Sequence, residues 1–139
     1  MKIALFGPFM YQLAVGLRQN PANDVRLFLD EATLPASLLD EPLLHDPAFV
    51  RMGPWVTPRT ILDPRRARIT HLLSDFDVAL VTELGPIYAQ QSKVEFVFIP
   101  TGWDLTCGPF PVRSRSTRRR GLGDLSAALI AGRLRQGIR

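Results

Sequence analysis

The chain of 139 residues has little cysteine, no long apolar run and no leader-like start. Cys107 is the only cysteine, which excludes an intramolecular disulfide and a zinc site built from cysteines. No apolar run approaches the ~18 residues that a membrane-spanning helix requires. The first residues form a short strand-like run that stops at Gly7-Pro8, without the longer apolar core of a signal peptide. These absences favour a cytoplasmic location, where thiols stay reduced.

Negative charge is scarce in the last fifth of the chain. Residues 113–139 carry eight Arg against one Asp, a net charge of +7, whereas residues 1–112 carry nine Lys and Arg against twelve Asp and Glu, a net charge of −3. A basic tail on a mildly acidic body predicts an anionic partner for the tail alone.

Strand-like and helix-like segments alternate along the body of the chain. Short apolar runs typical of buried parallel strands occur at 2–6, 24–29, 77–82 and 95–99. Apolar residues recur with helical spacing over 9–20 and again after Asp63-Pro64, a typical helix start. The first helix is expected to bury Met10, Leu13, Ala14 and Leu17. The alternation predicts an α/β fold: a single-domain, Rossmann-like three-layer sandwich with a mostly parallel sheet and the first strand at its centre.

A proline-rich segment, residues 31–62, interrupts this alternation. Its five prolines break every regular period, while its leucines, Phe49 and Trp55 indicate that it packs onto the domain. We interpret it as an insertion of short helical turns that lies over one end of the sheet. Because connections vary while the scaffold is kept, it is where selectivity for a ligand is expected.

Glycine and polar residues follow three of the predicted strands. The carboxyl ends of parallel strands share one edge of the sheet, where ligands of such folds bind. We therefore expect one concave surface, formed by Gly7, Thr82, Glu83, Thr101, Gly102, Trp103 and Asp104. Structural interpretations stay open: Gly7 as a turn residue, Glu83 as a carboxylate at a helix start, and Trp103 as a core residue. The chain has neither a Gly-x-Gly-x-x-Gly fingerprint after a strand nor a Gly-x-Ser-x-Gly nucleophile motif.

The segment Thr101-Gly102-Trp103-Asp104-Leu105 follows the last predicted strand. Together with the opening strand and its glycine turn, it resembles the N-terminal, acceptor-side domain of GT-B-fold glycosyltransferases of the retaining, nucleotide-sugar-dependent type. That domain carries His-Gly-x-Asp or Gly-Gly-Asp-Leu at this place. The resemblance covers nearly the whole chain through loose motifs. The chain departs from the family where Gly7-Pro8 replaces a glycine pair and where Thr101 replaces the histidine.

The resemblance implies transfer of a sugar from a nucleotide-sugar donor to a sugar or lipid-linked acceptor. Gly7 would allow close approach of the donor diphosphate, and Gly102 and Asp104 would shape the floor of the cleft. Transfer would depend on positioning and on stabilising the leaving diphosphate, with no metal, cofactor or assigned catalytic residue. The family's C-terminal donor-binding domain is absent from residues 1–139, so the chain is expected to be inactive alone. The alternative is a non-catalytic, flavodoxin-like module that binds a ligand or a protein.

A basic loop, residues 107–123, contains most of the excess positive charge, at Arg113, Arg115, Arg118, Arg119 and Arg120. A solvated loop, an anionic membrane surface or sugar-lipid acceptor, and nucleic acid all remain open as interpretations. Nucleic acid is the least favoured, because no aromatic residue is interleaved with these arginines and no nucleic-acid-binding module surrounds them. A membrane interpretation would place the protein peripherally at the inner face of the membrane.

Overall fold

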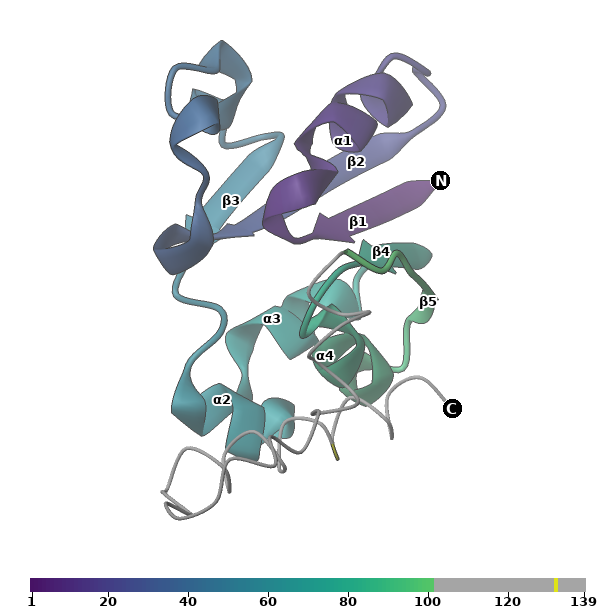
Figure 1. The fold of residues 1–139 in the computed structure, drawn as a ribbon. Coiled ribbons are helices and arrows are strands. Elements are labelled where there is room, and N and C mark those ends of the chain that lie inside the picture. The colour runs from purple at the N-terminus through teal and green to yellow at the C-terminus, as the bar shows by residue number, and fades with distance from the viewer. Residues whose placement is uncertain (102–131, 133–139) are drawn as a thin grey trace.

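The computed structural model describes residues 1–101 and Gly132, and residues 1–101 form an α/β sandwich around one parallel sheet (Figure 1). The five strands are β1 (Lys2–Phe6), β2 (Asp24–Asp30), β3 (Val50–Gly53), β4 (Val78–Val81) and β5 (Glu95–Phe98). Their order is β3-β2-β1-β4-β5, and every pairing is parallel. The predicted Rossmann-like fold with a central first strand is therefore confirmed.

Helices cover both faces of the sheet (Figure 1). One face packs against α1 (Tyr11–Arg18), which follows the 3₁₀ turn η1 (Pro8–Met10). The other packs against α3 (Arg68–Leu73) and α4 (Gly85–Ser92). The remaining short elements are η2 (Glu31–Thr33), η3 (Ala36–Leu38), η4 (Pro42–His45), α2 (Pro58–Leu62) and η5 (Pro64–Arg66). No helix within residues 1–101 combines the length and hydropathy needed to cross a membrane.

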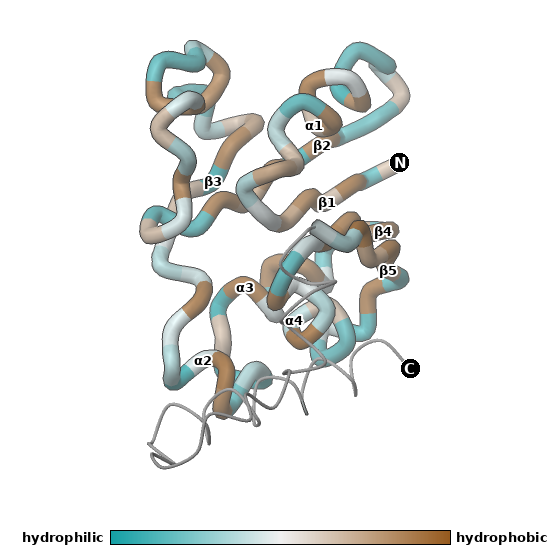
Figure 2. The backbone as a smooth tube through the Cα atoms, in the orientation of Figure 1, coloured by the Kyte–Doolittle hydropathy of each residue, from teal (hydrophilic) through white to brown (hydrophobic). Residues whose placement is uncertain are grey.

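The central strand shows why the sequence forms this sandwich. Ile3 and Leu5 of β1 pack on the α1 side, whereas Ala4 and Phe6 pack on the α3 and α4 side. Successive side chains of a strand point to opposite faces, so a strand covered on both sides must be apolar throughout. In Figure 2 the hydrophobic colour accordingly follows β1. The continuous apolar run at 3–6 thus fixes β1 in the interior.

The proline-rich segment contains a strand that the sequence pattern did not predict. The turns η2, η3 and η4 match the predicted short helical turns, but Val50–Gly53 form β3, which pairs with β2. Arg51 and Met52 of this edge strand are exposed, and prolines flank it at 47 and 54. A four-residue strand with half its residues facing solvent has no apolar run to reveal it. Trp55 is buried in the core, as the pattern indicated.

One helix buries a different face from the predicted one, and another starts later than predicted. In α1, Leu13 is 39% exposed and Tyr11 is buried instead, with its hydroxyl donating to Glu41 Oε2 at 3.1 Å. The helix expected from Asp63 begins as η5 and is interrupted at Ala67, which has an extended backbone. The Thr70 hydroxyl donates to the Pro64 carbonyl at 2.7 Å across this break, and α3 starts only at Arg68.

Candidate functional site

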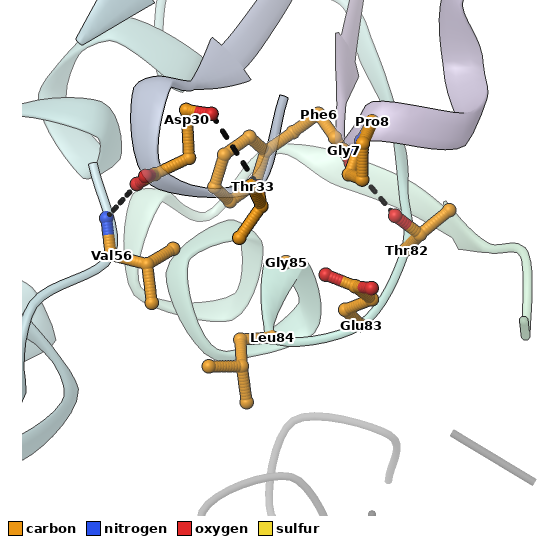
Figure 3. A pocket seen from close by; sticks show the side chains of 10 residues that line it. All are labelled: Phe6, Gly7, Pro8, Asp30, Thr33, Val56, Thr82, Glu83, Leu84 and Gly85. Carbon is orange, nitrogen blue, oxygen red and sulfur yellow. Dashed lines mark hydrogen bonds between the residues drawn. The ribbon is translucent and has the colours of Figure 1, made fainter. Parts of the chain in front are cut away.

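A cavity lies at the carboxyl edge of the sheet, where the strand order reverses. From β1 the chain continues to β2 on one side, whereas β4 pairs with β1 on the other. Loops leaving two such strands diverge and open a crevice between them. The structure has a cavity of about 90 Å³ there, lined by the ends of β1, β2 and β4 and by the start of α4 (Figure 3). We call this cavity the crevice.

Gly7 lines the crevice at the end of β1. Its φ of 133° belongs to the region that glycine tolerates and other residues rarely adopt. A Cβ at this position would overlap the Thr82 hydroxyl oxygen, so a side chain here would push the ends of β1 and β4 apart. Gly7 is therefore required for the packing of the two strand ends, in agreement with its interpretation as a turn residue.

Thr82 and Glu83 carry the chain from β4 to α4. The Thr82 amide donates to the Phe6 carbonyl at 3.1 Å, and its hydroxyl donates to the same oxygen at 3.4 Å. Glu83 has a φ of 49°, a left-handed conformation that costs a non-glycine residue free energy. The half-buried Glu83 lines the crevice. Backbone strain of this kind is concentrated at binding and catalytic sites.

Asp30, at the end of β2, lines the crevice and was not predicted as a site residue. Its side chain is 5% exposed, and its two oxygens accept from the Ala32 amide at 2.9 Å and the Val56 amide at 2.6 Å. These bonds tie β2 to η2 and to the chain that follows β3. The signal that could have identified Asp30 is its position directly at the end of the second parallel strand, the place from which an acidic residue contacts ribose in dinucleotide-binding folds.

The buried Tyr88 packs against Phe6, which lines the crevice. Burial raises the pKa of Tyr88, the Thr60 hydroxyl at 3.1 Å lowers it, and the charge of Asp30 raises it further. The Tyr88 ring packs edge-on against Phe6, at 5.9 Å between ring centroids. The floor below the crevice is therefore apolar and closely packed.

The predicted site residues divide into three groups. Gly7, Thr82 and Glu83 come together at the crevice. Thr101 lies beyond β5, whose continuation pairs with β4 through the Ile99 amide and the Val81 carbonyl at 2.9 Å, but it is outside the lining of the crevice. The remaining candidates, Gly102, Trp103 and Asp104, lie outside the described residues, as does the whole basic loop 107–123. The residues that follow β1 and β4 therefore lie at one common edge of the sheet, as predicted.

The described lining of the crevice is acidic. Among the residues of 1–101 that line it, the ionisable side chains are those of Asp30 and Glu83, and none is Lys, Arg or His. Within the described part of the chain, no three His, Cys, Asp or Glu side chains gather in a way that could hold a metal ion. The chemistry that the lining offers is acceptance of hydrogen bonds from a ligand.

A second cavity, of about 170 Å³, lies toward the opposite edge, near the starts of β1 and β2. Its charged lining residues are Lys2, Asp24, Arg26, Arg51 and Asp75. Positive and negative groups are mixed there, and Arg26 is held by Asp24 at 3.8 Å and by the Pro47 carbonyl at 3.3 Å.

Comparisons of the chain with protein-family models, with curated proteins and with solved structures found no match. What the fold and the site define is a class: a Rossmann-like α/β domain with an acidic crevice at its topological switch point.

Proposed function

We propose that the chain is the acceptor-side domain of a nucleotide-sugar-dependent glycosyltransferase and that it binds the acceptor at the crevice. The observation that carries the proposal is the position of the cavity at the switch point, where Gly7, Thr82 and Glu83 converge from two strand ends. The resemblance of residues 101–105 to the corresponding family segment supports the choice of a transferase.

The small size of the crevice supports a substrate cleft that is formed by two domains. Pockets that enclose a complete small ligand measure about 300–1,000 Å³. A cavity of about 90 Å³ has room for one group of a substrate, as expected for one wall of a larger cleft. The proposal therefore assigns most contacts of the donor to a second domain, and it predicts that this chain alone transfers no sugar.

In the proposed complex, residues of this chain position a hydroxyl group of the acceptor. The Glu83 carboxylate accepts a hydrogen bond from it, and the Thr82 hydroxyl oxygen, which donates to Phe6, keeps lone pairs available to accept another. Holding the reacting groups in register accelerates transfer by removing translational and rotational freedom.

Calorimetric titration of the full chain tests this function. The titrants are UDP-glucose, GDP-mannose and a panel of soluble mono- and disaccharides, with product formation assayed in parallel. The proposal predicts saturable binding of one or more saccharides, no micromolar binding of a nucleotide-sugar and no transfer. Micromolar affinity for a nucleotide-sugar, or no affinity for any saccharide, would contradict it.

A non-catalytic binding module is the second candidate, and the bonds of Asp30 favour it. Both oxygens of this carboxylate are held by backbone amides, so Asp30 is fixed in place. A pair of mobile acid and base groups is therefore missing from the described lining. Submicromolar binding of a small molecule that the chain leaves chemically unchanged would favour the module over the transferase.

A further inference from the structure

We infer that the second cavity, at the amino-terminal edge of the sheet, binds a small zwitterion with an apolar body, an amino acid such as leucine or phenylalanine. This cavity measures about 170 Å³, against about 90 Å³ for the crevice, and lies toward the other end of the strands. The two cavities share no described lining residue. The inference therefore goes beyond the proposed function and does not depend on it.

One wall of this cavity is the sheet, which contributes three cationic side chains. Lys2, Arg26 and Arg51 line the cavity from β1, β2 and β3, which are neighbouring strands. Residues that are paired in a parallel register, or two apart on one strand, lie on the same face of a sheet. Phe28 is paired with Arg51 and lies two residues after Arg26, and Lys2 lies two residues before Ala4. Because Ala4 and Phe28 pack on the α3 side, the three cations lie on that face of the sheet.

Two of these cations have no ion pair within the part of the chain that the structure describes. Arg26 is held by Asp24 and by the Pro47 carbonyl, so its charge is already matched. The ammonium group of Lys2 and the guanidinium of Arg51 take part in no ion pair or hydrogen bond of residues 1–101. A guanidinium presents parallel N–H groups that match the two oxygens of a carboxylate. Arg51 and Lys2 are therefore the residues that would hold a ligand carboxylate.

The other wall comes from the end of α3 and the turn after it, and it contributes a carboxylate. Leu72, Asp75 and Phe76 line the cavity from this side. Among the described residues, the Asp75 carboxylate also takes part in no ion pair or hydrogen bond. A carboxylate accepts charge-assisted hydrogen bonds from an ammonium group. A ligand with a single charge would meet like charge on one of the two walls, whereas a zwitterion matches both.

The rest of the described lining is apolar. The Phe28 and Phe76 rings meet edge-on at 5.8 Å between their centroids, and Leu72 lines the same space. An apolar side chain of a ligand would leave water by packing against these three residues. Pockets that enclose drug-sized ligands measure about 300–1,000 Å³, so a cavity of about 170 Å³ requires a more compact ligand. Leucine and phenylalanine combine this small size with both charges and an apolar body.

NMR spectroscopy of the ¹⁵N-labelled full chain tests the inference, at a pH of about 6.5 where α-amino groups are protonated. L-Leucine and L-phenylalanine are titrated separately, while the amide signals of Lys2, Arg51 and Asp75 are followed. The inference predicts saturable shifts of these signals with at least one of the two amino acids. If neither amino acid shifts them, or if sodium phosphate binds there as tightly as the amino acid, the inference is overturned.

Derivatives of the amino acid that binds more tightly test whether both charges are recognised. Its N-acetyl derivative lacks the ammonium group, and its amide lacks the carboxylate. Each derivative is expected to bind about tenfold more weakly than the parent, because each loses one charge-assisted contact. A derivative that binds as tightly as the parent would overturn the inference, since the cavity would then recognise one charge alone.

Variants locate the two contacts. Arg51→Gln is expected to weaken binding of the amino acid about tenfold, whereas Arg59→Gln, the same exchange at an exposed arginine of α2 outside this lining, is expected to leave it unchanged. Asp75→Asn is expected to weaken binding of the amino acid but not of its N-acetyl derivative, which has no ammonium group. Equal effects of the two arginine variants, or equal weakening of both ligands by Asp75→Asn, would overturn the inference.

The same spectra separate this inference from the proposed function. A saccharide at the crevice is followed through the amide signals of Gly7 and Gly85, which line the crevice. An amino acid that shifts only those signals would overturn the inference and leave the proposed function to its own titration. A saccharide that shifts neither signal would contradict the proposed function and leave the amino-acid site standing.

Discussion

Two residues of the described chain other than glycine have a left-handed backbone, Glu83 at the crevice and Lys93 at the end of α4. Lys93 follows the helix at the position where glycine is commonly found, because a left-handed residue ends a helix well. Glu83 has no such role in a helix cap. Its conformation instead brings a carboxylate to the mouth of the crevice, where glycine would bring nothing.

Substitutions at Lys93 and Glu83 separate the effect of backbone strain on stability from the role of Glu83 in binding. Lys93→Gly is expected to raise the free energy of unfolding by about 0.5–1 kcal/mol, because it relieves the left-handed conformation, and to leave ligand binding unchanged. Glu83→Gly relieves the same kind of strain but removes the carboxylate, so it is expected to abolish saccharide binding. Urea denaturation and saccharide titration of both variants measure the two quantities. A Glu83→Gly protein that binds as well as the parent would remove Glu83 from the site.

Trp55 combines close packing of its ring with an unsatisfied polar group. Its ring is buried and packs edge-on against Phe28 at 6.0 Å between centroids, yet its Nε1 has no hydrogen-bond partner among the described residues. An unsatisfied buried donor costs about 1–3 kcal/mol. The packing of the ring must therefore outweigh this cost.

Replacing Trp55 separates the two effects. Trp55→Phe removes the unsatisfied N–H together with some apolar area, so the free energy of unfolding is expected to change by less than about 1.5 kcal/mol. Trp55→Ala removes the packing as well and is expected to cost about 3–5 kcal/mol. Chemical denaturation of both variants measures these values. Equal losses would mean that the indole N–H contributes to stability through a partner.

At the scale of elements, α1 is held against the proline-rich segment by Arg18. Its guanidinium pairs with Asp46 at 2.9 Å and lies 4.7 Å from the centre of the Phe49 ring. The pKa of Asp46 is lowered, first by a hydrogen bond from the Ala48 amide and then by the bond from Arg18. This contact fixes the position of η4 on the α1 side of the sheet.

The Asp46 contact predicts a pH dependence of stability. The pKa of Asp46 is lower in the folded than in the unfolded chain, so its contribution is complete above the unfolded value of about 4. The contribution is lost as the pH falls through the folded value, because the protonated group no longer attracts Arg18. Asp46→Asn is therefore expected to lower stability at pH 7 and to flatten the loss of stability below pH ~4. An equal fall in the free energy of unfolding of the parent and variant proteins at acid pH would contradict this.

The strands that the sequence predicted are those with continuous apolar runs. In β1, β2 and β4, side chains on both faces of the strand pack into the core, and the half-exposed β5 carries the apolar run Phe96-Val97-Phe98. The missed strand β3 lies at the edge of the sheet with half of its residues in solvent, so pairing with β2 decides its conformation rather than its own pattern. In α1, Tyr11 is buried in place of Leu13, and its hydroxyl contacts Glu41, which is 30 residues away in the sequence.

At the scale of the whole molecule, the parallel sheet is what made the shared position of these candidate residues predictable. Gly7, Thr82 and Glu83 are far apart in the sequence, yet the shared direction of β1 and β4 brings them together. Asp30 lies at the end of β2 by the same rule, but its role depends on the Val56 amide, which only the path of the chain after β3 brings within reach. The strand order therefore predicted which edge of the sheet carries the crevice. Contacts between segments distant in the sequence hold the carboxylate of Asp30 there.

The measurement that tests the central claim most directly is a crystal structure of the full chain grown with methyl α-D-glucopyranoside. The account predicts the glucoside at the carboxyl edge between β1 and β4, with its hydroxyl groups contacting the Thr82 and Glu83 side chains. A crystal without the glucoside, or with the glucoside bound only in the cavity near Lys2 and Arg51, would contradict it.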